Sequence, residues 1–222
     1  MIKKYLVIGN PIEHSLSPKI HNYWFKTNNI DAVYEKKLVK RNEIEQLIKK
    51  IRNKEIDGIN VTVPFKNAVI PFLDQLTTEA KITKSVNTIS MEGNQLVGHN
   101  TDVAGFELAI RYIKFDVSKK KVLIIGAGGV VPSIIYSLEK MKADKISLIN
   151  RTKKNAEDIK KNFKEIEILD WSENPDFDMI INATSVGLSK EDKIDLKIEN
   201  FGKNKFFYDV IYKPRRTSFL NE

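Results

Sequence analysis

The sequence KVLIIGAGGVVP occupies residues 121–132 and places an apolar run directly before a cluster of glycines. The run is rich in β-branched residues, which is typical of a parallel strand covered on both faces. Glycines let the backbone turn sharply and approach a ligand, and Pro132 suits the first turn of a helix. A helix that begins there directs its free N–H groups and its positive dipole end at the turn. The stretch therefore predicts a strand, a tight turn and a helix that can hold a pyrophosphate.

This glycine turn departs from the dinucleotide-binding fingerprint at one position. Val131 stands where Gly or Ala usually allows the helix to pack closely on the strand. A strand, turn and helix that bind no ligand are therefore the alternative interpretation.

A second strand is expected at 145–149, and it ends in Asn150, Arg151 and Thr152. Folds that bind NAD usually carry an acidic residue here for the ribose hydroxyls. Arg151 instead favours a 2′-phosphate, because its guanidinium is always charged and can bond two oxygens at once. The position predicts NADP as the cofactor. The alternative is that Arg151 is a solvated surface charge and Thr152 a helix cap.

Length and composition limit the classes of protein. The 222 residues suffice for two modest α/β units, and the absence of cysteine excludes disulfides and fits a reducing cytoplasm. Three scattered histidines predict no metal site. The net charge of +8 suggests anionic partners, but the lysines are spread through amphipathic segments and no nucleic-acid-binding module is recognisable. Nucleic acid is therefore not expected as a partner. No apolar run has the length of a signal peptide or a membrane span, so a membrane is not expected as a partner either.

The first half of the chain alternates strands and helices. Strands are expected at 5–8, 32–39 and 58–64, and Asn42 is expected to cap a helix with an apolar stripe over 44–51. Such alternation predicts a mainly parallel sheet, whose ligands collect at the carboxyl ends of the strands. Thr62 and Lys66 stand at one such end.

Two polar sites in this half have alternative interpretations. Ser17 before Pro18 is expected to cap a helix, or else the hydroxyls of Ser15 and Ser17 face a polyhydroxylated ligand. Asp102 follows a predicted hairpin over 85–99 and opens a helix. It is either the N-cap of that helix or a carboxylate near the junction of two domains.

The remaining elements are expected to complete a second α/β unit. A helix is predicted over 156–163 and strands over 166–171, from 178 into a polar turn with glycine, and over 205–212.

Eight motifs, in order along the chain, together resemble shikimate dehydrogenase. They are Gly9-Asn-Pro11 with Ser15-Leu-Ser17-Pro18, Asn60-Val-Thr62-Val-Pro64-Phe65-Lys66, Val86-Asn87-Thr88, Asn100-Thr-Asp102, Gly126-Ala-Gly-Gly129, Asn150-Arg-Thr152, Asn182-Ala-Thr184 and Asp209-Val-Ile-Tyr212.

The resemblance implies a two-domain enzyme that reduces 3-dehydroshikimate to shikimate with NADPH, as a monomer or homodimer. It implies an α/β substrate domain over 1–101, a Rossmann-like NADP-binding domain over 102–222, and Lys66 and Asp102 as the catalytic pair. An ammonium group suits that role because hydride arriving at a carbonyl carbon leaves negative charge on the oxygen. The resemblance assigns substrate contacts to Ser15, Ser17, Thr62, Lys66, Asn87, Asp102 and Tyr212, and cofactor contacts to Gly126, Ala127, Gly128, Gly129, Val130, Asn150, Arg151, Thr152 and Val210.

The chain also departs from the family pattern. Asn155 stands where the family often has a basic residue, so Lys153 or Lys154 is expected to contact the phosphate, and Val130 and Val131 replace small residues at the glycine turn. The family continues after the last strand with a glycine, a glutamine and returning helices that this sequence does not contain. We therefore expect a fragment that binds substrate weakly and turns over poorly.

Two other functions remain open. One is a quinate/shikimate dehydrogenase that uses NAD more readily, against which Arg151 and Ser17 count. The other is a catalytically silent NADP-binding protein, against which the presence of both Lys66 and Asp102 counts.

Overall fold

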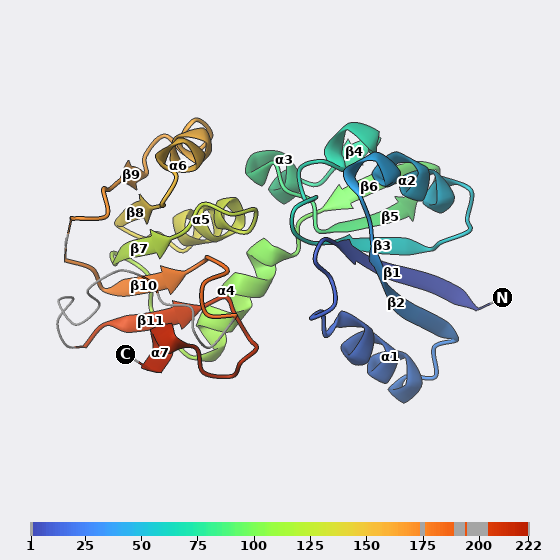
Figure 1. Ribbon diagram of the computed structural model, residues 1–222, viewed down its shortest axis with the longest axis horizontal. Helices are drawn as coiled ribbons and strands as arrows, with labels where there is room; N and C mark the ends of the chain where they lie inside the picture. Colours follow the sequence, from blue (N-terminus) through green and yellow to red (C-terminus); the bar gives the residue numbers. More distant parts are fainter. Residues whose placement is uncertain (1, 174–175, 189–193, 195–203, 222) are drawn as a thin grey trace. The chain divides into compact units, whose positions relative to one another are not determined.

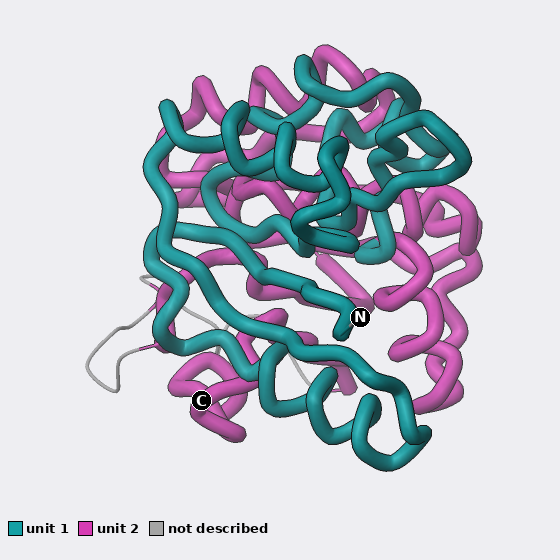
Figure 2. The backbone as a smooth tube through the Cα atoms, turned by 90° about the vertical axis from the view of Figure 1, so that its right-hand side faces the viewer, with its two compact units in different colours: residues 1–102 teal, residues 103–222 magenta. Residues whose placement is uncertain are grey.

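The computed structural model describes residues 2–173, 176–188, 194 and 204–221. Contacts between Cα atoms divide the chain into two compact units, residues 1–102 and 103–222, which Figure 2 shows in separate colours. Each unit has its own sheet and its own apolar core.

The first unit is built on a six-stranded sheet in the order β2-β1-β3-β5-β6-β4 (Figure 1). Strand β1 is parallel to β2 and β3, and β4 is parallel to β6. Strand β5 is antiparallel to both of its neighbours, β3 and β6. The sheet is therefore mainly parallel, with an antiparallel insertion. Its strands are β1 (Lys3–Gly9), β2 (Ala32–Leu38), β3 (Gly58–Val61), β4 (Gln75–Leu76), β5 (Thr88–Glu92) and β6 (Gln95–His99).

Helices cover both faces of this sheet. Helix α2 (Ile44–Arg52) buries Ile44, Leu47, Ile48 and Ile51, which confirms the predicted stripe. Burying each of these side chains contributes roughly 1.5–3 kcal/mol. Because side chains alternate along a strand, the cluster of Val7 and Tyr34 lies on the opposite face, where helix α1 (Ser17–Thr27) packs Phe25 against it. A short helix, α3 (Thr78–Thr83), and 3-10 turns at Arg41–Glu43 and Ile70–Phe72 complete the unit.

The helix caps predicted at Ser17 and Asn42 are wrong. Leu16 is the N-cap of α1, Ser17 is its first residue, and the hydroxyl of Ser15 accepts the N–H of Ser17 at 3.3 Å. Asn42 lies inside the 3-10 turn that precedes α2, and the side chain of Glu43 accepts the N–H of Lys40 at 2.6 Å. In both places a neighbouring side chain accepts a backbone N–H near the start of the helix.

The second unit is a Rossmann-like sheet of five parallel strands in the order β11-β10-β7-β8-β9. The central strand β7 buries Val122–Ile125, as its apolar run predicts, with an apolar cluster on each face of the sheet. The chain runs from β7 to β8 on one side and returns to β10 on the other, so the strand order reverses beside β7. The strands are β7 (Lys121–Ile125), β8 (Lys145–Ile149), β9 (Glu167–Ile168), β10 (Met179–Asn182) and β11 (Phe206–Asp209), and the helices are α4 (Asp102–Tyr112), α5 (Val131–Lys140), α6 (Lys153–Lys160) and α7 (Ser218–Asn221).

Several boundaries differ from those predicted. Helix α6 begins three residues before the expected start at 156, and the strand expected over 166–171 keeps only two ladder residues. Propensity alone places element ends poorly, because the last residues depend on tertiary hydrogen bonds.

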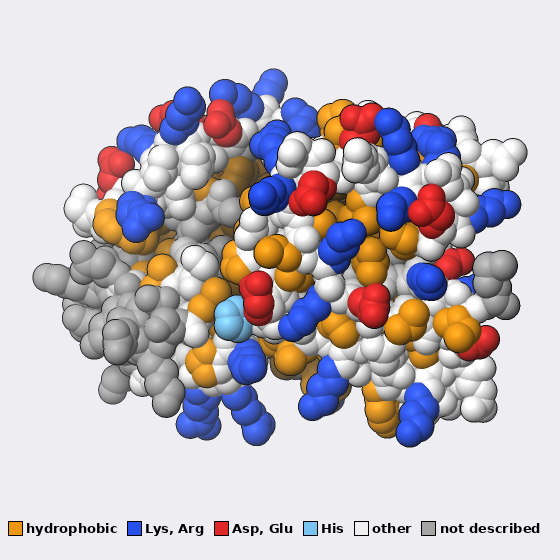
Figure 3. Space-filling view, turned by 45° about the vertical axis from the view of Figure 1, so that its right-hand side comes forward, with side chains coloured by type: hydrophobic (Ala, Val, Ile, Leu, Met, Phe, Trp, Pro, Cys, Tyr) orange, Lys and Arg blue, Asp and Glu red, His pale blue; other side chains and the backbone are white. Residues whose placement is uncertain are grey.

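The surface and the helices bear on the classes of partner. Figure 3 shows lysine and arginine side chains interspersed with acidic and apolar ones on the visible face, rather than gathered in one block. Within the part of the chain that the structure describes, no helix has the length and apolar character that crossing a membrane requires. The same residues contain no group of three or more histidine or acidic side chains placed to hold a metal ion.

Candidate active site

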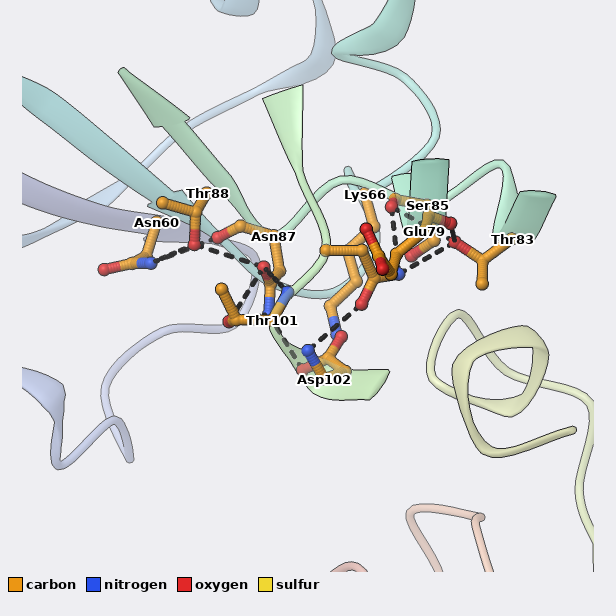
Figure 4. A network of polar contacts seen from close by, with 10 residues as sticks. Asn60, Lys66, Glu79, Thr83, Ser85, Asn87, Thr88, Thr101 and Asp102 are labelled. Carbon is orange, nitrogen blue, oxygen red and sulfur yellow. Dashed lines mark hydrogen bonds and ion pairs between the residues drawn. The ribbon is translucent and has the colours of Figure 1, made fainter. Parts of the chain in front are cut away.

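Lys66 and Asp102 form an ion pair in the first unit (Figure 4). Lys66 Nζ lies 2.6 Å from Asp102 Oδ2, and the two side chains are only 12% and 23% exposed. Lys66 belongs to the loop after β3, and its carbonyl accepts the N–H of Val86 at 2.8 Å, which fixes the loop beside the next strand. Lysine is rarely buried to this extent unless it is paired, and here Asp102 is the partner. Such a pair is unusual in a loop that only connects two elements of the fold.

Asn87 fixes the other oxygen of the carboxylate. Its Nδ2 donates to Asp102 Oδ1 at 2.9 Å, and its Oδ1 accepts the N–H of Thr101 at 3.0 Å. Asp102 is the first residue of α4, but Asn100 Oδ1 accepts its N–H at 3.0 Å, and its own carboxylate turns to Lys66 and Asn87. The carboxylate is thus held in one orientation by two side-chain donors.

A further row of polar side chains leads away from Asn87. Thr88 Oγ1 lies 3.1 Å from Asn87 Oδ1, Asn60 Nδ2 donates to Thr88 Oγ1 at 2.9 Å, and Tyr34 Oη donates to Asn60 Oδ1 at 2.5 Å. Burial raises the pKa of Tyr34, and a hydrogen bond with the Ser17 side chain acts in the opposite direction. Sequence reasoning did not single out Tyr34, and it assigned no role to Thr88 of the Val86-Asn87-Thr88 motif. A tyrosine on a strand is typical of the core, and only the register of β1 with β2 and β3 brings it near Asn60.

The polar loops after β1 and β3 meet because these strands are adjacent and parallel. Ile8 is paired with Val61, and Thr62 N donates to Ile8 O at 2.9 Å. A Cβ on Gly9 would lie 2.5 Å from the methyl of Thr62, so the close approach requires glycine. Ser15, Ser17 and Thr62, all partly buried, therefore follow neighbouring strand ends in the same unit as Lys66. Tyr212 belongs to the second unit, follows β11 and is 66% exposed.

The glycine turn of the second unit has the shape of a dinucleotide cradle. Gly126 has φ +106°, and a Cβ there would lie 2.8 Å from Thr184 Cγ2 and 3.0 Å from the Ala183 backbone. At Gly128 the nearest atom would be 3.8 Å away, and this residue is exposed. No side chain caps the N-terminus of α5, where Pro132 occupies the first turn. The backbone itself requires Gly126, whereas a side chain at Gly128 would meet open space. Ala127, Gly129 and Val130 complete the turn.

Val131, which departs from the fingerprint, is fully buried in the core of this unit. The larger side chain is therefore accommodated under the turn rather than displacing it toward solvent.

Asn150, Arg151 and Thr152 lie beside the glycine turn because Ile125 pairs with Ile149, and Gly126 N donates to Ile149 O at 2.8 Å. Asn150 Nδ2 donates to Thr152 O at 2.8 Å, and Thr152 is the N-cap of α6 without a side-chain capping bond. Arg151 is exposed. The two loops thus run from adjacent strand ends.

The lysines after this loop differ in their surroundings. Lys153 Nζ lies 3.0 Å from Asp170 Oδ1, and this hydrogen bond raises the pKa of Lys153. Its charge is already engaged by Asp170, which leaves Lys154 as the better candidate for a phosphate contact.

The ends of β10 and β11 are tied together by a buried amide. Asn182 Nδ2 lies 3.2 Å from both oxygens of Asp209, and Thr217 Oγ1 donates to Asp209 Oδ2 at 2.6 Å. Val210 N donates to Asn182 O at 3.0 Å, which orients the chain after β11. These contacts fix the strand ends next to Gly126.

The second unit is a parallel sheet with a glycine turn where its strand order reverses. The α/β unit that precedes it in the chain carries a lysine and aspartate pair. This combination is typical of the class of two-domain dinucleotide-dependent oxidoreductases. Residues 7–89 match the family model described as shikimate dehydrogenase substrate binding domain, and residues 107–215 match the one described as shikimate / quinate 5-dehydrogenase. The chain belongs to the shikimate dehydrogenase family.

Individual relatives agree with this assignment. The shikimate dehydrogenase (NADP(+)) of Pelagibacter ubique (strain HTCC1062) is 56% identical over 220 residues, which are 99% of this chain and 83% of the relative. The crystal structure of shikimate dehydrogenase from Aquifex aeolicus has a TM-score of 0.89 at 34% identity, over 99% of this chain and 82% of that one. The shikimate 5-dehydrogenase of Thermus thermophilus, in complex with NADP(H) and shikimate, has a TM-score of 0.89 at 27% identity, over 99% and 83%. The predicted α/β fold with a Rossmann-like second unit is confirmed.

Proposed function

We propose that the protein catalyses the reversible, NADPH-dependent reduction of 3-dehydroshikimate to shikimate, a step of aromatic amino-acid biosynthesis. The observation that carries the proposal is the 2.6 Å contact between Lys66 Nζ and Asp102 Oδ2 in a chain of this family. The proposal assigns substrate binding and catalysis to the first unit and NADP binding to the second.

When bound, NADPH supplies the hydride that reduces the carbonyl carbon of the substrate. The carbonyl oxygen then gains negative charge, which the Lys66 ammonium stabilises while its Nζ donates a proton. Asp102 holds Nζ in place by the 2.6 Å contact, and Asn87 holds Asp102. In the oxidative direction Lys66 Nζ receives the proton of the substrate hydroxyl. Such proton transfer contributes about 10²- to 10⁴-fold in rate.

The remaining polar groups would bind and orient the ring acid. Hydroxyls of Ser15, Ser17 and Thr62 suit the carboxylate and the ring hydroxyls, because each hydroxyl both donates and accepts. Asn87 would add its amide. The family resemblance adds Tyr212, from the second unit.

For the cofactor, backbone N–H groups of Gly126–Val130 at the start of α5 would hold the pyrophosphate. The turn fits this role, since a side chain is excluded at Gly126 and space is left at Gly128. Arg151, with Asn150 and Thr152 on either side and Lys154 nearby, would hold the 2′-phosphate of NADP. The carbonyl of Val210 is the proposed contact to the nicotinamide end.

The proposal is tested by initial rates at the absorbance band of reduced nicotinamide. Four assays combine shikimate or quinate with NADP or NAD at matched concentrations. We expect shikimate with NADP to be the best pair. Comparable rates with quinate and NAD would favour a quinate/shikimate dehydrogenase. A Lys66→Ala variant that kept the wild-type rate would favour the silent NADP-binding protein.

Two finer points belong to the same proposal. We place the enzyme in the cytoplasm, whose reducing conditions suit a chain without cysteine. We expect a monomer or a homodimer, which sedimentation of the purified chain would distinguish.

A further inference from the structure

A continuous row of hydrogen bonds connects Tyr34 with Lys66. It runs from Tyr34 through Asn60, Thr88 and Asn87 to the carboxylate of Asp102, which accepts from Lys66. Figure 4 shows this row from Asn60 to Lys66. Each of its bonds measures between 2.5 and 3.1 Å, so the contacts are real hydrogen bonds by geometry.

The row has a single donor direction. Tyr34 donates to the oxygen of the Asn60 amide, which turns the Asn60 nitrogen to Thr88. Thr88 therefore directs its hydroxyl hydrogen to Asn87 Oδ1. The Asn87 nitrogen is left for Asp102 Oδ1. A flipped Asn87 amide would place an oxygen against the carboxylate. Thr88 opposes that flip together with the Thr101 N–H, which donates to the same Asn87 Oδ1 at 3.0 Å.

Tyr34 is a firm origin for this row. Its ring is 3% exposed and stacks on His21 with centroids 4.3 Å apart at an angle of 3°. The Asn22 side chain donates to Tyr34 O at 2.8 Å and accepts Tyr34 N at 2.9 Å, which fixes the backbone. Burial raises the pKa of the phenol, so it keeps its hydrogen at neutral pH.

We propose that Tyr34 is a positioning residue for catalysis, because its hydroxyl holds the Asn60 amide and, through Thr88, reinforces the orientation of Asn87 against Asp102 that the Thr101 N–H also favours. The inference rests on the proposed function of Lys66 and Asp102. Tyr34 lies in the core of the first unit, in a strand remote in sequence from Lys66 and Asp102. The proposal gives it an influence on the orientation of the Lys66 ammonium.

The test compares Tyr34→Phe with Tyr5→Phe in the full chain. Tyr34→Phe keeps the ring and its stacking on His21 but removes the donor to Asn60. Tyr5 lies in the same apolar cluster, against Phe25 at a centroid distance of 5.7 Å, and contributes no atom to the row. We expect kcat for shikimate to fall about three- to tenfold in Tyr34→Phe, the effect of one lost hydrogen bond. KM for NADP should stay the same, and Tyr5→Phe should match the wild type.

A pair of substitutions at Thr88 tests transmission along the row. Thr88→Val removes the hydroxyl at nearly constant volume and should lower kcat as Tyr34→Phe does. Thr88→Ser restores the hydroxyl and should recover most of that loss. Equal losses in Val and Ser variants, or in Tyr34→Phe and Tyr5→Phe, would mean that packing alone is disturbed and would overturn the proposal.

Side-chain amide NMR signals give a readout that does not depend on turnover. Tyr34→Phe should shift the Asn87 side-chain amide signals as well as those of Asn60, and Tyr5→Phe should shift neither. Asn87 signals at wild-type positions in Tyr34→Phe would overturn the proposal whatever the rates. A wild-type chain that did not turn over shikimate would contradict the proposed function. The amide spectra of the two variants would still show whether Tyr34 influences Asn87 through the hydrogen-bond row.

Discussion

At the scale of single residues, the proposed function makes the ammonium of Lys66 the group on which the chemistry depends. It is partly buried, paired at 2.6 Å with Asp102, and held at the strand end where ligands of parallel sheets collect. A pair that served only stability would be a costly choice, because desolvating two charges offsets much of their attraction. The geometry is better explained if Asp102 holds the Lys66 ammonium in a fixed orientation toward the substrate of the proposed reaction.

Lys66→Met keeps the aliphatic stem and removes the charge. We expect kcat for shikimate to fall at least about 100-fold, since proton transfer and charge stabilisation are both lost. Lys81→Met, on the exposed face of α3, is the matched control and should keep wild-type kcat. Circular dichroism would check that both variants fold. A Lys66→Met enzyme within tenfold of the wild type would contradict the assignment.

Arg151 is the residue expected to select the cofactor. Arg151→Ala should weaken NADP binding about 10- to 100-fold, the effect of losing charge-assisted hydrogen bonds, and leave the Kd for NAD unchanged. The exposed Arg111 of α4 provides the control, Arg111→Ala, which should alter neither constant. Fluorescence titration with both nucleotides measures the ratio. An unchanged preference in Arg151→Ala would show that Lys154 or another group reads the phosphate.

At the scale of elements, the turn between β7 and α5 shows how backbone geometry creates a binding surface. Gly126 is required by its φ of +106° and by the approach of Thr184 from the neighbouring strand end. Gly128, two residues later, has open space where a side chain would stand. The same motif therefore contains one glycine that the fold requires and one that the fold does not require, which we propose serves the cofactor.

Two alanine substitutions separate these roles. Gly126→Ala should lower the free energy of unfolding by about 2–4 kcal/mol, because it adds backbone strain and a contact at 2.8 Å. Gly128→Ala should change it by less than about 1 kcal/mol while weakening NADP binding. Urea denaturation and nucleotide titration measure the two effects. Equal loss of stability in both variants would contradict this division.

At the scale of the whole molecule, each of the two units buries its own apolar clusters and presents its own set of polar residues. The proposed function gives each unit one ligand. Ligand binding stabilises the region that it contacts, by about 2.7 kcal/mol at 100 times Kd.

Hydrogen exchange read by mass spectrometry tests this division of labour. Shikimate should slow exchange in peptides that cover 58–66 and 85–102, and NADP should slow it in peptides that cover 121–131 and 149–154. Mannitol, a polyol without the carboxylate, serves as the control for shikimate. Protection by shikimate confined to 103–222 would overturn the assignment of substrate to the first unit.

The sequence by itself determined the class of fold. Periodicity placed the stripe of α2, the buried strand β7 and the hairpin, because local hydrophobic patterns directly encode which face is buried. The resemblance of eight sequence motifs to a known family pointed to Lys66 and Asp102. Cap residues and strand ends were predicted less well, since these depend on single hydrogen bonds.

Only the tertiary structure decided which polar groups meet. Lys66 and Asp102 are 36 residues apart, and their contact follows from the pairing of β3 with β5 and of β5 with β6. The ring of Tyr34 is buried in the core, as is typical of a tyrosine on a strand. The register of β1 with β2 and β3 brings its hydroxyl to Asn60, on which the proposed positioning role depends. Local patterns specify burial, whereas the partner of a buried polar atom depends on chain segments that no local pattern contains.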